Sequence, residues 1–216
     1  MSICGRPVRR PYEDTERVSQ HGSGTMTREL IYTGFIALDG AIDSPGGTAE
    51  GHPGGGWVFD TEFVSDAFSL KAEELEETTA LLFGRRSYEA FSNFWPTSPD
   101  HAAYHDLPKY VASTTLGDDD LVDGWGPTTI LRTTEDIADL KQTEGGAIFI
   151  HGSADLALRL GEAGLIDRYN LLMFPYLLPG GKTIFSASGA DRRGLALRDS
   201  ATYANGVVKL VYDVRR

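Results

Sequence analysis

Residues 147–177, AIFIHGSADLALRLGEAGLIDRYNLLMFPYL, decide the fold of this 216-residue chain. The apolar run at 147–152 ends in a glycine and predicts a short buried strand, and residues 167–177 predict a longer strand. Between these two strands, residues 153–163 predict a helix. Strands interleaved with helices are typical of an α/β protein with a mainly parallel central sheet.

The same alternation continues on both sides of this unit. Upstream, the sequence predicts strands at 29–37, 79–84, 109–113 and 128–132, and helices at 60–78, 86–94, 99–106 and 134–142. The helix at 60–78 is expected to bury one face, formed by Phe63, Ala67, Leu70 and Leu75. Downstream, residues 194–203 and 206–215 predict two strands of a β-hairpin. We therefore expect a three-layer α/β sandwich whose mostly parallel central sheet ends in an antiparallel C-terminal hairpin.

Residues 1–27 differ from the rest of the chain. They hold four arginines, several glycines and almost no periodic apolar residues, which predicts a disordered N-terminal extension before a single domain at 28–216. Met26 stands shortly before the first predicted strand and could be the natural start, which would make the upstream part dispensable. A real tail used for contacts is the alternative.

The composition excludes some classes of partner. The formal net charge is −11 at pH 7, whereas a nucleic-acid binder needs a broad basic surface. The only cysteine is Cys4, so no intrachain disulfide can form, which fits a reducing compartment. Neither a signal-peptide pattern nor a run of about 18 apolar residues is present. We therefore expect a cytoplasmic protein that binds neither nucleic acid nor membrane.

Several known motifs are incomplete in this chain. Residues 180–183, GGKT, resemble the end of a phosphate-binding P-loop, but Tyr176 stands where the first glycine of that motif belongs. His101 and His105 are four residues apart with no further expected ligand nearby, so we predict no metal site. A GxGxxG fingerprint after the first strand and a GxSxG nucleophile motif are both absent.

Three predicted strand ends carry groups that suit a phosphate. Ligands of open α/β sheets bind beyond the carboxyl ends of the strands. The groups at these ends are Gly84, Arg85, Arg86 and Ser87, then Ser113, Thr114 and Thr115, and finally Gly152, Ser153 and Ala154. Free amides at a helix start, hydroxyls and guanidinium groups all donate to anions. The local alternatives are Ser153 as a helix N-cap, Gly84 as a turn residue, and an Arg85 or Arg86 pair with Glu89.

Four stretches of the chain resemble a known family. LLFGRRSYEAFSNFWP, KYVASTTL, TGFIALDGAI and the segment from AIFIHG to LLPGGKTIF look like the dihydrofolate-reductase-like fold. The resemblance is strongest to the branch that holds the reductase domain of riboflavin biosynthesis. It runs from about residue 29 to the C-terminus.

This resemblance implies a nicotinamide dinucleotide, usually NADPH. Carried over by position, Gly84, Arg85, Arg86 and Ser87 would hold the phosphates, and Gly152, Ser153 and Ala154 would pass under the pyrophosphate. Ser113 and Thr114 would lie near the adenosine ribose and its 2′-phosphate. Ala37, Leu38, Asp39 and Gly40 would border the nicotinamide. Riboflavin-type relatives commonly dimerise through edge strands, so the resemblance also implies a homodimer.

On the substrate side, the resemblance implies a pterin- or pyrimidine-like heterocycle. The glycine-rich loop at 44–56 is expected to act as a lid, and Trp57 to wall a flat substrate. Asp60 or Glu62, at the expected start of the next helix, and Asp39 are the candidate catalytic acids. Asp60 as a helix N-cap and Asp39 as a turn residue are the alternatives, and His151 is expected in the core or behind the site.

Two departures leave the substrate and the activity open. No zinc-deaminase signature accompanies the reductase stretches, and no second basic cluster suits a substrate phosphate. We therefore predict an NADPH-dependent reductase of a small heterocycle. A non-catalytic nucleotide-binding or sensor protein on the same fold is the alternative.

Overall fold

The structure is a computed structural model that describes residues 27–48, 51–185 and 192–216. The predicted N-terminal extension as far as Met26, together with Cys4, lies outside the described residues. So do residues 49–50 of the glycine-rich loop.

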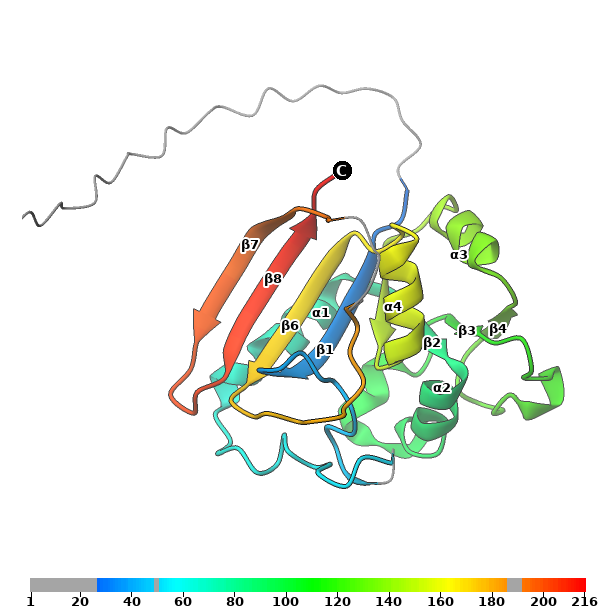
Figure 1. Cartoon of the computed structure of the whole chain (residues 1–216). Coiled ribbons are helices and arrows are strands. Elements are labelled where there is room, and N and C mark those ends of the chain that lie inside the picture. The colour runs from blue at the N-terminus through cyan, green and yellow to red at the C-terminus, as the bar shows by residue number, and fades with distance from the viewer. Residues whose placement is uncertain (1–26, 49–50, 186–191) are drawn as a thin grey trace, which may run out of the picture.

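Among the described residues, eight strands form one sheet in the order β4-β3-β2-β5-β1-β6-β8-β7 (Figure 1). The pairs formed among β1 to β6 are all parallel, whereas β8 pairs antiparallel with both β6 and β7. The expected mostly parallel sheet with a C-terminal hairpin is therefore confirmed. The strands are β1 (Leu30–Ala37), β2 (Thr78–Gly84), β3 (Lys109–Ala112), β4 (Thr128–Leu131), β5 (Ala147–His151), β6 (Arg168–Phe174), β7 (Leu195–Thr202) and β8 (Val208–Val214).

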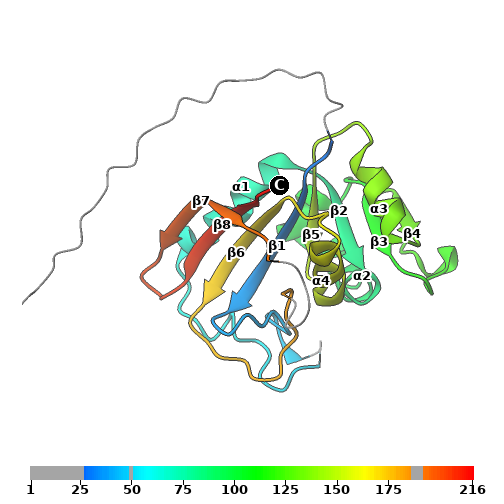
Figure 2. The same ribbon diagram turned by 45° about the horizontal axis from the view of Figure 1, so that its top comes forward.

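Helices on both faces of the sheet complete the three expected layers. The helices are α1 (Ser69–Glu77), α2 (Arg85–Ser92), α3 (Thr134–Lys141) and α4 (Ala154–Glu162). Leu82 of β2 belongs to the buried cluster of Leu160 in α4, and its neighbour Phe83 to the cluster of Tyr88 in α2. Successive side chains of a strand point to opposite faces, so α2 and α4 cover different faces. Figure 1 shows α4 in front of the sheet and α1 behind it, and Figure 2 shows the same separation after a rotation.

The unit β5-α4-β6 is the one predicted from residues 147–177. Its strands are near-continuous apolar runs because helices cover both faces of the central sheet. Helix α4 ends shortly before Gly164, whose φ of 73° is a left-handed conformation that favours glycine. The chain then enters β6, which lies parallel to β1.

The predicted helix at 60–78 is wrong in its first half. A 3-10 segment at Ser65–Phe68 precedes α1, which begins only at Ser69. Ala67 and Leu70 are buried as expected, but the side chains of Phe63 and Leu75 are exposed. The expected buried face assumed one continuous α-helix over residues 60–78. Because α1 begins only at Ser69, the helical spacing does not extend to the residues before it. The short helix expected at 99–106 is likewise a 3-10 segment, Pro99–Tyr104.

Candidate functional site

The three predicted strand ends lie side by side at one edge of the sheet. β3, β2 and β5 are parallel neighbours, so their carboxyl ends meet at the same edge. In Figure 1 this is the lower edge, where α2 begins. The topology therefore brings together all three groups of residues that the sequence singles out.

The ends of β2 and β5 interlock at two glycines. The amide of Gly84 donates to Ser153 Oγ at 2.7 Å. A Cβ atom on Gly84 would lie 3.3 Å from Ser153 Oγ, and one on Gly152 would lie 3.1 Å from Ser87 Oγ. Gly152 also has a φ of 61°, which side chains disfavour. Glycine at these positions therefore lets the two turns approach closely and keeps their backbone open.

Helices α2 and α4 both begin without a side-chain cap. Ser153 occupies the N-cap position of α4, but its hydroxyl accepts from Gly84 and caps no amide of α4. The N-cap of α2 is Gly84, which has no side chain to offer. By contrast, Thr133 and Asp136 cap α3 reciprocally. The first amides of α2 and α4 are therefore left to an outside acceptor, which is what a helix start needs to bind an anion.

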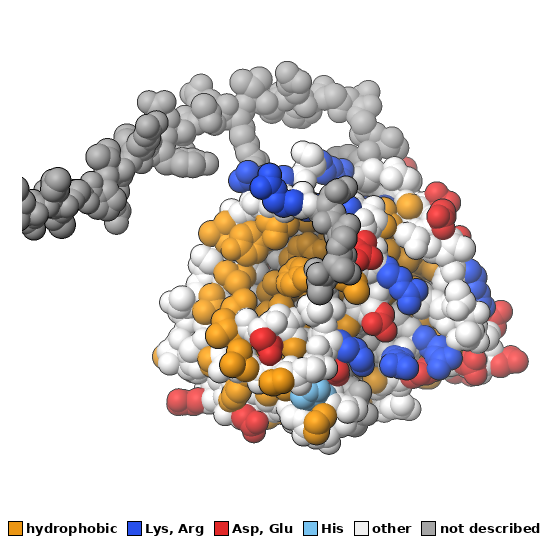
Figure 3. All heavy atoms as spheres, viewed as in Figure 1, with side chains coloured by type: hydrophobic (Ala, Val, Ile, Leu, Met, Phe, Trp, Pro, Cys, Tyr) orange, Lys and Arg blue, Asp and Glu red, His pale blue; other side chains and the backbone are white. Residues whose placement is uncertain are grey.

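Two arginines at the start of α2 differ in their partners. Arg85 donates to Thr115 Oγ1 at 2.8 Å and pairs with Glu89 at 3.2 Å, where both side chains are about half exposed. An exposed pair of this kind is weak and leaves the cation available. Arg86 is exposed and has no hydrogen bond or ion pair with any residue that the structure describes. Figure 3 shows Lys and Arg side chains gathered over α2.

The loop after β3 is held by its own residue Ser113 and by Arg132, a cation that was not predicted from the sequence. Ser113 Oγ accepts from the amides of Thr115 and Leu116, so this hydroxyl shapes its own turn. Arg132, directly after β4, donates to the carbonyl oxygens of Ser113 at 2.9 Å and Leu116 at 2.7 Å. Thr114 is exposed beside them. The position of Arg132 at the end of a neighbouring parallel strand is the signal that could have found it.

Residues at the end of β1 separate into buried and exposed positions. Ala37 is fully buried, whereas the side chain of Leu38 is 62% exposed. Asp39 is a turn residue, because its Oδ2 accepts from the amide of Leu178 at 2.6 Å and its Oδ1 from that of Ala41 at 3.3 Å. Its carboxylate therefore joins the loops after β1 and β6, as the turn-residue alternative for Asp39 expects.

The prediction that Trp57 walls the substrate is wrong. Its side chain is 2% exposed, packs edge-on against Phe174 at 5.4 Å and donates from Nε1 to the carbonyl oxygen of Asp43. The preceding loop folds back so far that Trp57 fills the core instead. Asp60 and Glu62 are exposed in the loop before α1, and neither carboxylate contacts a described partner. No helix begins at Asp60, so the N-cap alternative for it is wrong as well.

A buried polar cluster between α1 and the sheet was not predicted. Glu74 of α1 is 1% exposed and accepts from Thr33 Oγ1 at 2.6 Å and from Asn170 Nδ2 at 2.9 Å. Lys71 lies 3.1 Å from the other oxygen of Glu74 and also donates to Thr33 Oγ1. The sequence signal for this cluster was a polar residue within each of two mainly apolar strands, Thr33 in β1 and Asn170 in β6. We call Thr33, Lys71, Glu74 and Asn170 the Glu74 cluster.

The strand register places the Glu74 cluster next to the interlocked glycines. Thr33 of β1 is opposite His151 of β5, and Gly152 follows His151 directly. The ring of His151 lies among Phe83, Trp95 and other aromatic rings, and its Nε2 is buried without a partner among the described residues. Burial, helped by the positive charges of Lys71 and His101, lowers the pKa of His151 to about 3. The ring is therefore neutral near neutral pH.

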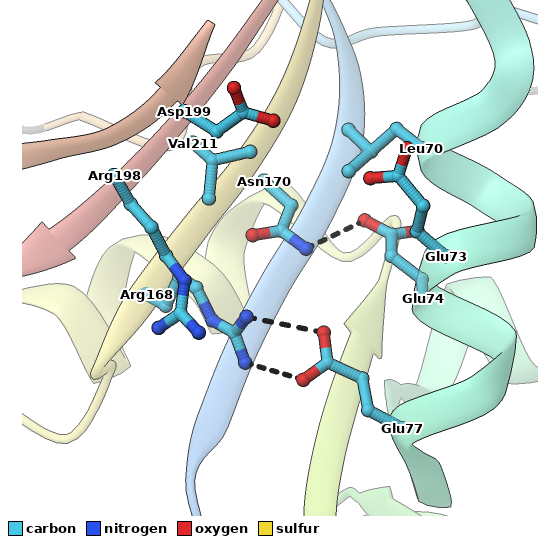
Figure 4. Close-up of a pocket in the computed structure, with 9 residues that line it drawn as sticks. All are labelled: Leu70, Glu73, Glu74, Glu77, Arg168, Asn170, Arg198, Asp199 and Val211. Carbon is cyan, nitrogen blue, oxygen red and sulfur yellow. Dashed lines mark hydrogen bonds and ion pairs between the residues drawn. The ribbon is translucent and has the colours of Figure 1, made fainter.

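A cavity of about 90 Å³ lies behind Glu74, between α1 and strands β6, β8 and β7 (Figure 4). Arg168 forms a double hydrogen bond with Glu77 there, at 2.9 and 3.2 Å. Arg168 Nε and Asn170 Oδ1 are buried with no partner in the described part of the chain. A polar cavity of this size has room for a few waters, which would satisfy these atoms.

Other kinds of site find no support in the part of the chain that is described. These residues contain no group of three or more His, Cys, Asp or Glu side chains that could hold a metal ion. Within the same ranges, no helix is long and apolar enough to cross a membrane.

Comparison with known proteins places this fold and site in context. A model of the RibD C-terminal domain matches residues 28–209. The uncharacterized protein YyaP of Bacillus subtilis (strain 168) is 26% identical over 192 residues, which are 86% of this chain and 94% of that protein.

Two solved structures have a similar fold. A putative riboflavin biosynthesis protein from Shewanella sp. PV-4 has a TM-score of 0.65 and 19% identity, over 87% of this chain and 99% of its own. Dihydrofolate reductase from Enterococcus faecalis, in complex with NADP(H) and RAB-propyl, has a TM-score of 0.54 and 15% identity, over 87% of this chain and 97% of its own. The expected dihydrofolate-reductase-like fold is thereby confirmed. Because the family match extends over nearly the whole predicted domain, the chain belongs to the RibD C-terminal domain family.

Proposed function

We propose that the protein is a reductase that uses NADPH to reduce a small heterocycle of the pterin or pyrimidine kind. The reductase-type fold supports the reaction class, and the similar dihydrofolate reductase is a protein in complex with NADP(H). The observation that carries the proposal is the interlocked pair of turns at Gly84 and Gly152. These turns present, at one sheet edge, two helix starts without a side-chain cap and Arg86, which pairs with no residue in the described ranges.

The residues at this edge fit the polar parts of a dinucleotide. Arg86 and the first amides of α2 would bind one phosphate, and the first amides of α4 would bind its neighbour in the pyrophosphate. Arg85 and Ser87 would add donors beside them. Thr114 and Arg132, at the ends of β3 and β4, would lie near the ribose and select the 2′-phosphate of NADPH over NADH. An acidic chain would thus concentrate positive potential where its anionic ligand binds.

The nicotinamide end of the cofactor would lie where β1 continues beyond the end of β5. Residues 34–37 of β1 have no partner on the β5 side, because that pairing ends at Thr33 and His151. Ala37 and Leu38 would border the nicotinamide, which supplies a hydride when NADPH is bound. The Glu74 cluster lies beside this place, and its Lys71–Glu74 pair can hold a proton for the substrate. Asp60 and Glu62 stay predictions, which Asp60→Asn and Glu62→Gln would test.

Nucleotide binding is tested by thermal unfolding and by titration calorimetry with NADPH and NADH. At about 100 times its dissociation constant, NADPH should stabilise the folded protein by about 2.7 kcal/mol and raise its melting temperature by several degrees. Arg86→Ala should weaken NADPH binding by about tenfold, because a charge-assisted contact to phosphate is lost. Arg159→Ala, in the last turn of α4, is the matched control and should bind as the unaltered protein does. Absence of any shift with either nucleotide contradicts the proposal.

The alternative is a nucleotide-binding protein without turnover. The placement of Asp39 in a turn and of Asp60 and Glu62 in an exposed loop favours it, since the expected acids do not converge. Oxidation of NADPH in the presence of candidate substrates distinguishes the two functions. A reductase oxidises bound NADPH when candidate pterins and pyrimidines are added, and the alternative binds NADPH but consumes none with any of them.

A further inference from the structure

The cavity behind Glu74 lies on the side of this residue that faces away from β5 and the interlocked glycines. The sheet order places β8 and β7 beyond β6, away from β1 and β5, and the cavity is lined by residues of α1, β6, β8 and β7. Arg168 is the first residue of β6, so the cavity also lies toward the amino ends of the parallel strands. It is therefore separate from the sheet edge at which cofactor and substrate would bind.

Two buried polar atoms in this cavity lack a partner among the described residues. Arg168 is 4% exposed and Asn170 is 1% exposed, and both line the cavity. The terminal nitrogens of Arg168 donate to Glu77, and its Nε–H has no acceptor in the described ranges. Asn170 donates from Nδ2 to Glu74, and its Oδ1, turned away from Glu74 in Figure 4, has no donor in those ranges. A molecule that satisfies both atoms must accept one hydrogen bond and donate another.

The charges around the cavity favour a cation. Carboxylates outnumber cations in its lining, which holds Glu73, Glu74, Glu77 and Asp199 against Arg168 and Arg198. The ion-pair partners of these residues are Glu29, Asp213, Lys71 and Lys209, so six carboxylates in all face four cations. Lys209 alone serves both Asp199, at 2.7 Å, and Glu73, at 3.6 Å. These surroundings disfavour another anion and favour a ligand that brings a positive charge.

A β-bulge in β7 forms the outer wall of the cavity. Leu197 is opposite Tyr212 and Asp199 is opposite Val211, so Arg198 is an additional residue in this strand. Bulges redirect side chains and are features of a fold rather than defects. Arg198 and Asp199 both line the cavity, although they are successive residues of one strand. The bulge thus places a guanidinium and a carboxylate at the wall instead of a single side chain.

We propose that this cavity binds a small primary ammonium compound that carries a hydroxyl group, such as ethanolamine. The ammonium would donate to Asn170 Oδ1 and face the carboxylates of Glu73 and Asp199. The hydroxyl oxygen would accept from Arg168 Nε–H. The volume of about 90 Å³ suits a molecule of a few heavy atoms. Because Asn170 also donates to Glu74, the ligand would be one side chain away from the Glu74 cluster. This inference goes beyond the proposed function and does not depend on it.

The test is a titration of the full chain with ethanolamine, followed by NMR of the nitrogen-bound protons in phosphate buffer at neutral pH, where the amine is protonated. Ethanolamine should shift the Arg168 Nε–H and Asn170 side-chain amide signals, with a dissociation constant in the millimolar range, because so small a ligand has little binding energy. Ethylamine lacks the hydroxyl, glycine has a carboxylate in its place and ethylene glycol lacks the charge. Each should bind at least about fivefold more weakly than ethanolamine.

Two glutamates of α1 provide a matched pair of variants. Glu73 lines the cavity, whereas Glu76 is absent from its lining, and both are exposed. Glu73→Gln should weaken ethanolamine binding about threefold, because a carboxylate that faces the ammonium is lost. Glu76→Gln should leave the binding unchanged. Val211→Met extends a longer apolar side chain into the cavity and should abolish the shifts, and urea unfolding checks that this variant is folded.

Three results would overturn the inference. One is the absence of shifts at Arg168 and Asn170 in the unaltered protein up to about 100 mM ethanolamine, which would mean that the cavity holds water only. Another is equal affinity for ethanolamine, glycine and ethylene glycol. The third is an equal effect of Glu73→Gln and Glu76→Gln, which decides the question even if Val211→Met does not fold.

Discussion

At the scale of single residues, the backbone of Ser153 is strained. Its φ of 63° and ψ of 56° are left-handed, and it follows Gly152 at a φ of 61°. A left-handed conformation costs a residue with a side chain about 1 kcal/mol or more, and such strain gathers at functional sites. The hydrogen bond from Gly84 to Ser153 Oγ helps to hold the turn in place. In the proposed function, this conformation aims the first amides of α4 at a phosphate.

His151 makes the stability of the protein depend on pH. Its pKa is lowered by burial to about 3 in the folded protein, against an ordinary value of 6.5. Between these values the unfolded chain binds a proton that the folded protein does not, so stability falls as the pH drops below about 6.5.

The substitution His151→Gln should remove this acid sensitivity. Between about pH 7.5 and pH 5, the unaltered protein should lose roughly 2 kcal/mol more unfolding free energy than the variant. Urea unfolding at both pH values measures the difference. Equal losses in the two proteins would show that the ring is already protonated, or freely solvated, in the folded state.

At the scale of elements, α1 is attached to the sheet by charged and polar contacts as well as by its apolar face. Leu70 joins the apolar cluster together with Ala67 of the preceding 3-10 segment, while Glu74 and Glu77 contact Asn170 and Arg168 of β6. The position of α1 therefore depends on the register of β6. A one-residue shift of β6 would move Arg168 and Asn170 to the other face.

Two arginines, one in β6 and one in β7, allow a matched test of this attachment. Arg168 has a 5% exposed side chain and contacts Glu77 and Glu29, whereas Arg198 has a 49% exposed side chain and pairs with Asp213. Arg168→Met should lower the unfolding free energy by about 3 kcal/mol, and Arg198→Met by less than about 1 kcal/mol. Chemical denaturation of both variants checks the contrast. Similar losses of unfolding free energy in the two variants would mean that the buried contacts of Arg168 add little to the stability of the protein.

At the scale of the whole molecule, the sheet is covered unevenly. On the face that α4 covers, the described residues of β7 present Leu195 and Leu197 at 38% and 57% exposure, and Phe185 is 41% exposed next to Tyr169. Figure 3 shows a continuous group of hydrophobic side chains over β7 and β8 on this face. Monomeric proteins rarely expose large apolar patches, and β7 is also an edge strand.

We expect this surface to pair with a second copy of the chain, as the resemblance to riboflavin-type reductases implies. Leu197→Asp should convert the dimer to a monomer, because a twofold interface would bury the new charge twice. Phe59→Asp is the control, since Phe59 is 77% exposed in the loop between β1 and α1. Light scattering after size-exclusion chromatography measures the mass of each. A monomeric unaltered protein would contradict this expectation.

The sequence by itself determined the order of the elements, the parallel sheet with its terminal hairpin, and the glycines and arginines at the strand ends. These features are readable because apolar periodicity and strand-to-helix turns are local properties of the chain. The interlock of Gly84 with Ser153 required knowing that β2 and β5 are neighbours in the sheet, although these two residues are 69 positions apart along the chain.

Only the tertiary structure decided which side chains are buried around the site. Trp57 and Asp39 were predicted to face a ligand but are used by the core and by a turn, whereas the burial of Glu74 beside Lys71 was not predicted from the sequence. The physical reason is that the phase of α1 and the register of β1 against β5 and β6 are set by packing between distant segments. Neither can be derived from the local pattern of residues, and together they place the Glu74 cluster beside Gly152.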